Sequence, residues 1–241
     1  MPFRNILLLI LFLGLSYLFF CLAIDNGFWH GEDFLSLEHS LLMKEGAISA
    51  FDSSPPFKFQ PLVYGLYYLL FTRFLFDARG YFIFNIILHG FNSFLVFLLV
   101  NTLLKDRTVA LLSGLLFVFT VGSYGKSVMI VSGLEDIVIT FLTLLTMLFY
   151  FKNEIDAGGK LISRWFFLAL LFFVASMLTR STSFSILGAF LAFNLLYRAD
   201  TSKRPLSADF LVLLAIAIAA LIIKTRGFHY APNLYTKDPG P

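Results

Sequence analysis

The stretch YFIFNIILHGFNSFLVFLLVNTLL, residues 81–104, contains no charged side chain over 24 residues. A helix needs about 20 mostly apolar residues to cross a bilayer, so this stretch is long enough to span one. Its polar residues Asn85, His89 and Asn92 recur at i, i+4 and i+7, which places them on one face of the predicted helix. Interhelical hydrogen bonds are the simplest role for that face, since His89 has no His or Cys partner at a metal-binding spacing.

Six further apolar segments flank this one on both sides: 5–24, 109–121, 133–151, 165–179, 182–197 and 208–223. Hydrophobic residues make up 59% of the 241 and charged residues only 14%, whereas soluble domains are about half apolar and a quarter charged. We therefore predict an all-α, polytopic transmembrane helix bundle of about seven spans. The whole chain, 1–241, is interpreted as one transmembrane module.

The first segment is interpreted as a spanning anchor, residues 1–24, and not as a cleaved signal peptide. Its apolar run is longer than the usual signal core of about 7–15 residues. The six other spans fall within 81–223. Between them and the anchor lies the main polar part of the chain, residues 25–80.

Segment 61–76 decides the topology, because it is short, tyrosine-rich and carries Arg73. If it lies along the membrane interface, the densest basic loops face the cytoplasm together with the N-terminus, as the positive-inside rule expects. These loops hold Lys105/Arg107, Lys152/Lys160/Arg164 and Arg198/Lys203/Arg204. We therefore predict an extracytoplasmic 25–80 loop with interfacial helices and an outer tail over 224–241.

Composition also excludes several classes of function. The net charge of +3 comes without a basic run, so no nucleic-acid partner is expected. Cys21 is the only cysteine, which rules out an intrachain disulfide and a cysteine metal cluster. The chain also lacks a phosphate-binding glycine loop, a nucleophile elbow and a zinc motif.

An acidic pair, Glu32-Asp33, opens the polar loop about eight residues after the first span. Such carboxylates could act as a general base at the membrane surface or bind a divalent cation. The alternative is a solvated loop in which Asp33 caps a short helix over 34–45. The pair by itself does not separate these interpretations.

Arg180 lies in Thr-Arg-Ser-Thr-Ser, residues 179–183, which is a polar break between two apolar segments. An arginine at membrane depth usually faces the protein interior. It could bind a phosphate in a bidentate manner or extend its head group to the interface from a helix end. Both interpretations stay open.

Two sites look like helix beginnings. Ser132 and Glu135 match a capping box. Ser207 is a candidate N-cap, with Asp209 in the following first turn. Glu135 and its neighbour Asp136 are interpreted as residues that cap a helix and complement its dipole.

The order of these features resembles the membrane glycosyltransferases of the GT-C fold, especially bacterial relatives of protein O-mannosyltransferases. The likeness covers roughly 5–200 and rests on three features. They are a first span followed by Glu32-Asp33-Phe34-Leu35, a Pro-Leu-rich aromatic helix over 59–68, and a span with Asn85, His89 and Asn92 on one face. Two positions depart from the family pattern: Gln60 stands where a basic residue often precedes the Pro-Leu pair, and Thr120-Val121 stands where many relatives have His-Pro.

The resemblance implies a multi-pass protein of a bacterial inner membrane that transfers a sugar to an acceptor hydroxyl on the outer face. The donor would be a lipid-linked sugar on polyprenyl phosphate. Asp33 is the first choice for the base and Glu32 the second. Arg180 and Lys58 are expected to bind the donor phosphate, and Gln60 and His89 are counted with the substrate-binding residues. No cofactor is required, although a divalent metal is compatible with the acidic pair.

Two other functions are weighed against this one. The same fold could serve as a non-catalytic membrane subunit or lipid-carrier binding module. Such a protein would need a partner subunit in addition to the membrane lipids. A small transporter is disfavoured, because intramembrane charges are few and no pair of broken helices is evident. The chain stops in a polar segment, so a truncated product and an inactive relative both stay open.

Overall fold

The computed structural model describes residues 2–28, 30–52, 58–120, 127–201 and 206–227, and these residues are helical with short connections. The α-helices are α1 (Pro2–Phe20), α2 (Gly31–Lys44), α3 (Pro61–Phe74), α4 (Ala78–Leu104), α5 (Arg107–Val118), α7 (Leu134–Ala157), α8 (Arg164–Met177), α9 (Ile186–Thr201) and α10 (Ala208–Gly227). Two short 3₁₀ helices are η1 (Cys21–Asp25) and η2 (Ser181–Ser185). The predicted all-α fold is confirmed. The outer tail predicted over 224–241 lies outside the described residues beyond Gly227.

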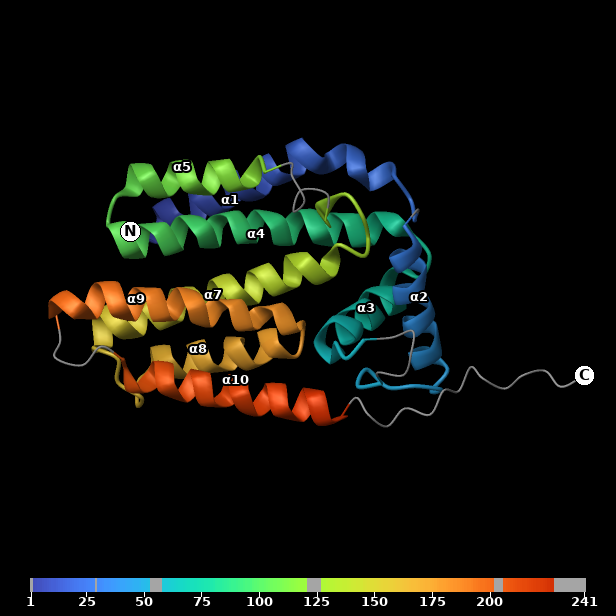
Figure 1. The fold of residues 1–241 in the computed structure, drawn as a ribbon. Coiled ribbons are helices and arrows are strands. Elements are labelled where there is room, and N and C mark those ends of the chain that lie inside the picture. Colours follow the sequence, from blue (N-terminus) through green and yellow to red (C-terminus); the bar gives the residue numbers. More distant parts are fainter. Residues whose placement is uncertain (1, 29, 53–57, 121–126, 202–205, 228–241) are drawn as a thin grey trace, which may run out of the picture.

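The long helices run side by side and alternate in direction (Figure 1). The connections α4–α5, α7–α8 and α9–α10 share one end of the bundle, which we call the inner end. The predicted basic residues lie in these connections or at the helix ends beside them, except for Lys203 and Arg204, which lie outside the described residues. Helices α2 and α3 cover the opposite end, which we call the outer end (Figure 1). This arrangement agrees with the alternation predicted for the spans.

Three helices in the described part of the chain are long and apolar enough to cross a membrane. They cover Phe3–Asp25, Ala78–Leu104 and Leu134–Ala157. Four shorter apolar helices follow the remaining predicted segments, over Arg107–Val118, Arg164–Met177, Ser183–Leu196 and Ala208–Ile222. The multi-pass character is therefore clear, while the count of seven spans stays a prediction.

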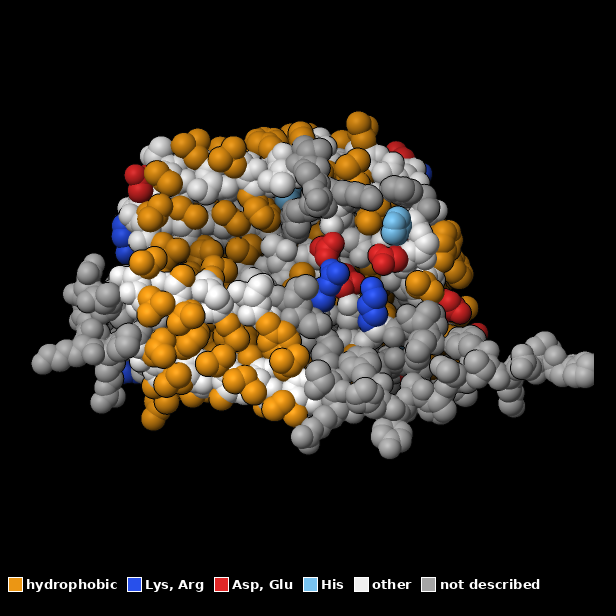
Figure 2. Space-filling model, viewed as in Figure 1, with side chains coloured by type: hydrophobic (Ala, Val, Ile, Leu, Met, Phe, Trp, Pro, Cys, Tyr) orange, Lys and Arg blue, Asp and Glu red, His pale blue; other side chains and the backbone are white. Residues whose placement is uncertain are grey.

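Four apolar clusters hold the described helices together, and the two smaller ones pack α1 against α4 and its neighbours. Of the two larger clusters, one joins α7, α8, α9 and α10 around large buried rings such as Tyr150, Phe173 and Phe190. The other joins α2 and α3 to α4 and α7 around Tyr67, Phe71 and related side chains. Large apolar side chains also cover much of the outside of the bundle (Figure 2). That surface is the one expected to face lipid.

The polar face predicted for 81–104 binds main-chain carbonyls of neighbouring segments. Asn85 Nδ2 donates to the Ile130 carbonyl and Asn92 Nδ2 to the Ile137 carbonyl, each at 3.0 Å. All three polar residues of that face are fully buried. The bond of Asn92 to Ile137 joins α4 to α7 and confirms the predicted interhelical hydrogen bonding, while the bond of Asn85 holds α4 to the segment that precedes α7.

Helix ends bear out some predictions and overturn one. Ser207 Oγ accepts from the Phe210 N–H at 3.4 Å, so the predicted N-cap of α10 is confirmed. The capping box predicted at Ser132 and Glu135 is wrong. The N-cap residue of α7 is Gly133, without a side-chain cap, and the Glu135 carboxylate is bonded to residues of other elements.

Candidate functional site

The candidate site lies at the outer end, where α2, α3 and the beginning of α7 meet. Charged side chains gather there on a face that is otherwise largely apolar (Figure 2). They border a narrow cavity of about 90 Å³. Its walls are formed by Glu32, Leu35, Ser36, Lys58, Gln60, Val63, Tyr64, Tyr67, Ser132 and Glu135.

Glu32 is the acidic residue of the pair that lines this cavity. Helix α2 begins at Gly31, with His30 as its N-cap, so Glu32 and Asp33 occupy the first turn. Successive residues of an α-helix point about 100° apart, because there are 3.6 residues per turn. The Glu32 side chain is 60% exposed, and its Oε1 lies 3.9 Å from Lys58 Nζ. Its carboxylate is therefore accessible to a ligand in the cavity.

Asp33 is turned inward and is fully buried. Its Oδ1 accepts from the Ser132 N–H at 2.6 Å, and its Oδ2 accepts from the His30 N–H at 3.2 Å. The second contact forms a capping box, since the His30 ring in turn accepts from the backbone at the start of α2. Asp33 thus joins the beginning of α2 to the segment that precedes α7.

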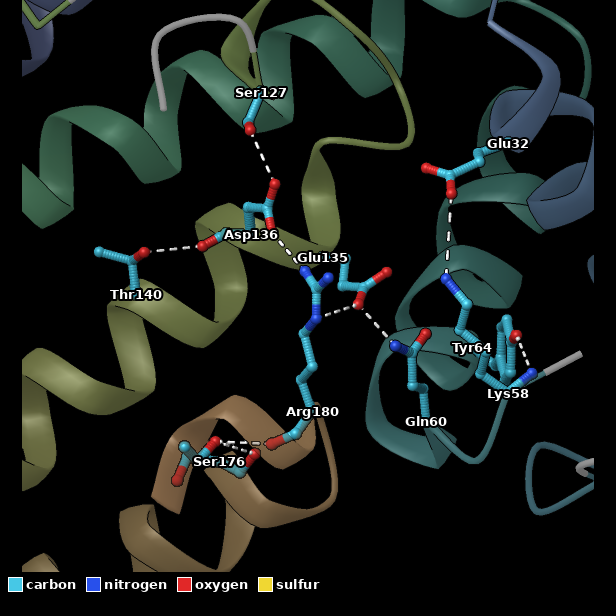
Figure 3. A network of polar contacts seen from close by, with 11 residues as sticks. Glu32, Lys58, Gln60, Tyr64, Ser127, Glu135, Asp136, Thr140, Ser176 and Arg180 are labelled. Atoms are coloured by element: carbon cyan, nitrogen blue, oxygen red, sulfur yellow. Dashed lines mark hydrogen bonds and ion pairs between the residues drawn. The ribbon is translucent and has the colours of Figure 1, made fainter. Parts of the chain in front are cut away.

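Arg180 follows α8 and extends to the first turn of α7 (Figure 3). Its Nη1 lies 2.7 Å from Asp136 Oδ1, and its Nε lies 3.2 Å from Glu135 Oε1. The arginine side chain is 39% exposed. Asp136 also accepts a hydrogen bond of 2.8 Å from Ser127 Oγ. The guanidinium is therefore paired with two carboxylates in this structure.

Gln60 connects this ion-pair group to the cavity. Its Nε2 donates to Glu135 Oε1 at 2.5 Å, so that Gln60 and Arg180 reach the same carboxylate from different elements (Figure 3). The nearby Lys58 main chain is held by its N–H, which donates to the Tyr64 hydroxyl at 3.1 Å. The Lys58 side chain is 63% exposed, and the Glu32 carboxylate is its ion-pair partner.

The predicted site residues are therefore brought together in part. Glu32, Lys58 and Gln60 line one cavity, and Arg180 reaches its edge through Glu135. Asp33 lies behind the cavity wall. His89 lies elsewhere: its buried ring sits 3.1 Å from the Val118 carbonyl and packs on the Phe20 ring.

The roles of Glu135 and Asp136 were missed at the sequence level. Both lie in the first turn of α7, as the dipole interpretation predicts, yet both also hold Arg180. A signal was present in the predicted topology. The outer start of one span and the outer end of the next antiparallel span must lie at the same level, so their charges can meet.

The charges and size of the site limit what it can bind as it stands. Three carboxylates surround two cations, Lys58 and Arg180. A cavity of about 90 Å³ is smaller than the roughly 300–1,000 Å³ typical of ligand pockets. A sugar phosphate would therefore have to move the exposed Lys58 side chain or loosen the Arg180 ion pairs. Among the described residues no group of three His, Cys, Asp or Glu side chains is placed to hold a metal ion.

Comparison with known proteins gives the family. The model of the dolichyl-phosphate-mannose-protein mannosyltransferase family matches residues 47–228, about three quarters of the chain. Members of this family use a lipid-linked mannose donor. The match includes Lys58, Gln60 and Arg180, whereas Glu32 and Asp33 precede it. No curated protein and no solved structure gives a significant match. The chain belongs to the dolichyl-phosphate-mannose-protein mannosyltransferase family.

Proposed function

We propose that this chain transfers mannose from a polyprenyl-phosphate-linked donor to a hydroxyl group of an acceptor protein, at the extracytoplasmic face of the membrane. The family match supports the donor class. The observation that carries the proposal is the cavity in which a carboxylate and a lysine, Glu32 and Lys58, lie together beside the Arg180 ion pairs. This set contains a base and two phosphate-binding cations.

Glu32 is proposed as the general base. It takes the proton of the acceptor hydroxyl, whose oxygen then attacks the anomeric carbon of mannose. The bond between that carbon and the phosphate oxygen breaks, and polyprenyl phosphate leaves with the bonding electrons. The order proposed from the sequence is reversed here, because the Asp33 carboxylate is occupied by two backbone N–H groups and Glu32 borders the cavity.

Lys58 and Arg180 are proposed to stabilise the charge that develops on the leaving phosphate. Electrostatic stabilisation of such charge is commonly the largest catalytic term. Lys58 is suited to this role because its side chain is exposed at the cavity mouth. Arg180 can join it when a phosphate competes with Glu135 or Asp136 for the guanidinium. Gln60, which binds Glu135, would set how readily that exchange occurs.

The test is mannose transfer from polyprenyl-phosphate mannose to a serine- or threonine-containing peptide, with the chain in membranes. Glu32→Gln should lower transfer by about 10²–10⁴-fold, the usual contribution of general base catalysis. Donor binding should change little. Glu38→Gln is the matched control, since Glu38 is exposed on the same helix.

Two results would contradict the proposal. Full activity of Glu32→Gln would remove Glu32 as the base. Donor binding by the unmodified chain without any transfer would favour the alternative function, a non-catalytic subunit or lipid-carrier binding module.

A further inference from the structure

A second groove lies at the inner end of the bundle, between the beginnings of α1 and α5. These helices run side by side in the same direction (Figure 1). The groove has a volume of about 470 Å³, within the roughly 300–1,000 Å³ of ordinary ligand pockets. It is lined by two arginines, one threonine and four leucines. The groove is at the end of the molecule opposite the cavity of the proposed function.

The mouth of this groove is positively charged. Arg4 lies in the first turn of α1, and Arg107 is the first residue of α5. Both side chains are exposed. The beginning of a helix already carries a partial positive charge, so arginines there are electrostatically unfavourable unless an anion is near. The carboxylate of Asp106 is used to cap α5, because its Oδ1 accepts from the N–H groups of Thr108 and Val109 at 2.8 and 3.1 Å.

The floor of the groove is apolar. Leu7, Leu8 and Leu11 extend it along α1, and Leu111 lines it from α5. Beyond the leucines α1 and α5 are in close contact, since a Cβ added to Gly114 of α5 would lie only 2.7 Å from the Phe12 ring of α1. From Arg4 to Leu11 the helix rises by about 10 Å at 1.5 Å per residue. A ligand that fits must therefore combine an anionic head with an apolar chain.

We propose that the α1–α5 groove binds one anionic phospholipid. Its phosphate lies between Arg4 and Arg107, where guanidinium groups donate charge-assisted hydrogen bonds to phosphate oxygens. An acyl chain occupies the leucine-lined floor. The charge at the mouth selects an anionic lipid over a zwitterionic one, and the apolar floor selects a lipid over free phosphate. This inference does not rest on the proposed transferase activity.

The test is native mass spectrometry of the full chain, titrated with phosphatidylglycerol or with phosphatidylcholine of the same acyl chains. We expect one retained phosphatidylglycerol and at least tenfold weaker retention of phosphatidylcholine. R4Q/R107Q should weaken phosphatidylglycerol binding at least tenfold. The control K105Q/K160Q, which removes two exposed basic residues at the same end, should weaken it less than threefold.

A second pair of variants tests the apolar floor without changing charge. Leu111→Trp fills the groove and should also weaken phosphatidylglycerol binding, whereas Leu112→Trp, at an exposed position of the same helix, should not. Equal retention of the two lipids, or equal losses in the two charge variants, would overturn the proposal. Displacement of the lipid by inorganic phosphate at equal concentration would also overturn it.

Discussion

Asp33→Asn separates an anchoring role from a catalytic one. The carboxylate is fully buried and accepts two backbone N–H groups, from Ser132 at 2.6 Å and from His30 at 3.2 Å. Asparagine has the same shape but only one accepting oxygen. One of the two N–H groups, the buried one of Ser132 or the partly buried one of His30, therefore loses its acceptor. The other keeps a neutral hydrogen bond in place of a charge-assisted one.

The magnitude follows from these contacts. A hydrogen bond to a charged group contributes about 1.5–3 kcal/mol, and an unsatisfied buried donor costs about 1–3 kcal/mol. The substitution also removes the cost of burying a charge, which offsets part of this loss. We expect Asp33→Asn to lower the free energy of unfolding by about 2 kcal/mol. Glu38→Gln, on the exposed side of the same helix, should change it by less than about 0.5 kcal/mol.

The assay is thermal unfolding of the chain in nanodiscs, combined with hydrogen exchange of single amides. In Asp33→Asn the amides of His30 and Ser132 should exchange faster, and the transition temperature should fall. The anchoring role is refuted if Asp33→Asn abolishes mannose transfer while both amides and the transition temperature stay unchanged. Asp33 would then be the base, as the first choice from the sequence has it.

Three further predictions concern the outer end. Glu135→Gln leaves Arg180 with one carboxylate, so a donor phosphate has one competitor fewer for the guanidinium. Because a partly exposed ion pair contributes about 0–1 kcal/mol, donor affinity should rise by up to about fivefold in a binding assay. Weaker donor binding would contradict the proposed exchange. Burial lowers the pKa of His39 below its ordinary value of 6.5, so the folded state loses stability as the pH falls below about 6.5. In thermal unfolding at pH 7.5 and 5.5, His39→Phe should remove this loss of stability at the lower pH. If the variant loses as much stability as the unmodified chain, another group causes the pH dependence. Gly133→Ala should destabilise the chain by several kcal/mol in the same assay, since its Cβ would overlap the Ser127 carbonyl; wild-type stability would show that this segment can shift.

Local patterns in the sequence predicted the helices and several of their contacts. Asn85 and Asn92 were placed on one face because helical periodicity is a local property, and both bind carbonyls of the neighbouring segment. Ser207 was predicted as an N-cap for the same reason. Helix α3 was predicted from its composition, and it lies across the outer end of the bundle as α2 does (Figure 1).

The candidate site was predicted less completely, because its geometry depends on tertiary contacts. One of the two open interpretations of the acidic pair placed a short helix over 34–45 with Asp33 as its cap, whereas α2 begins at Gly31. The earlier start determines whether the Glu32 or the Asp33 carboxylate faces inward. The position of that start does not follow from the sequence alone. The capping box of Ser132 failed for a related reason: Glu135 binds Gln60 and Arg180, which lie far away in the sequence.

The ion pairs of Arg180 bear on how a lipid-linked donor would enter. An unpaired arginine at membrane depth is costly, and the pairing with Glu135 and Asp136 would offset that cost. A donor phosphate that approaches Lys58 can replace one carboxylate at the guanidinium, so Arg180 keeps two anionic partners during binding. The affinity for donor would then depend on the difference in free energy between the Arg180–phosphate pair and the Arg180–carboxylate pair that it replaces. For this reason Glu135 and Gln60, which do not contact the proposed reacting atoms, should affect donor affinity more than the rate of the chemical step.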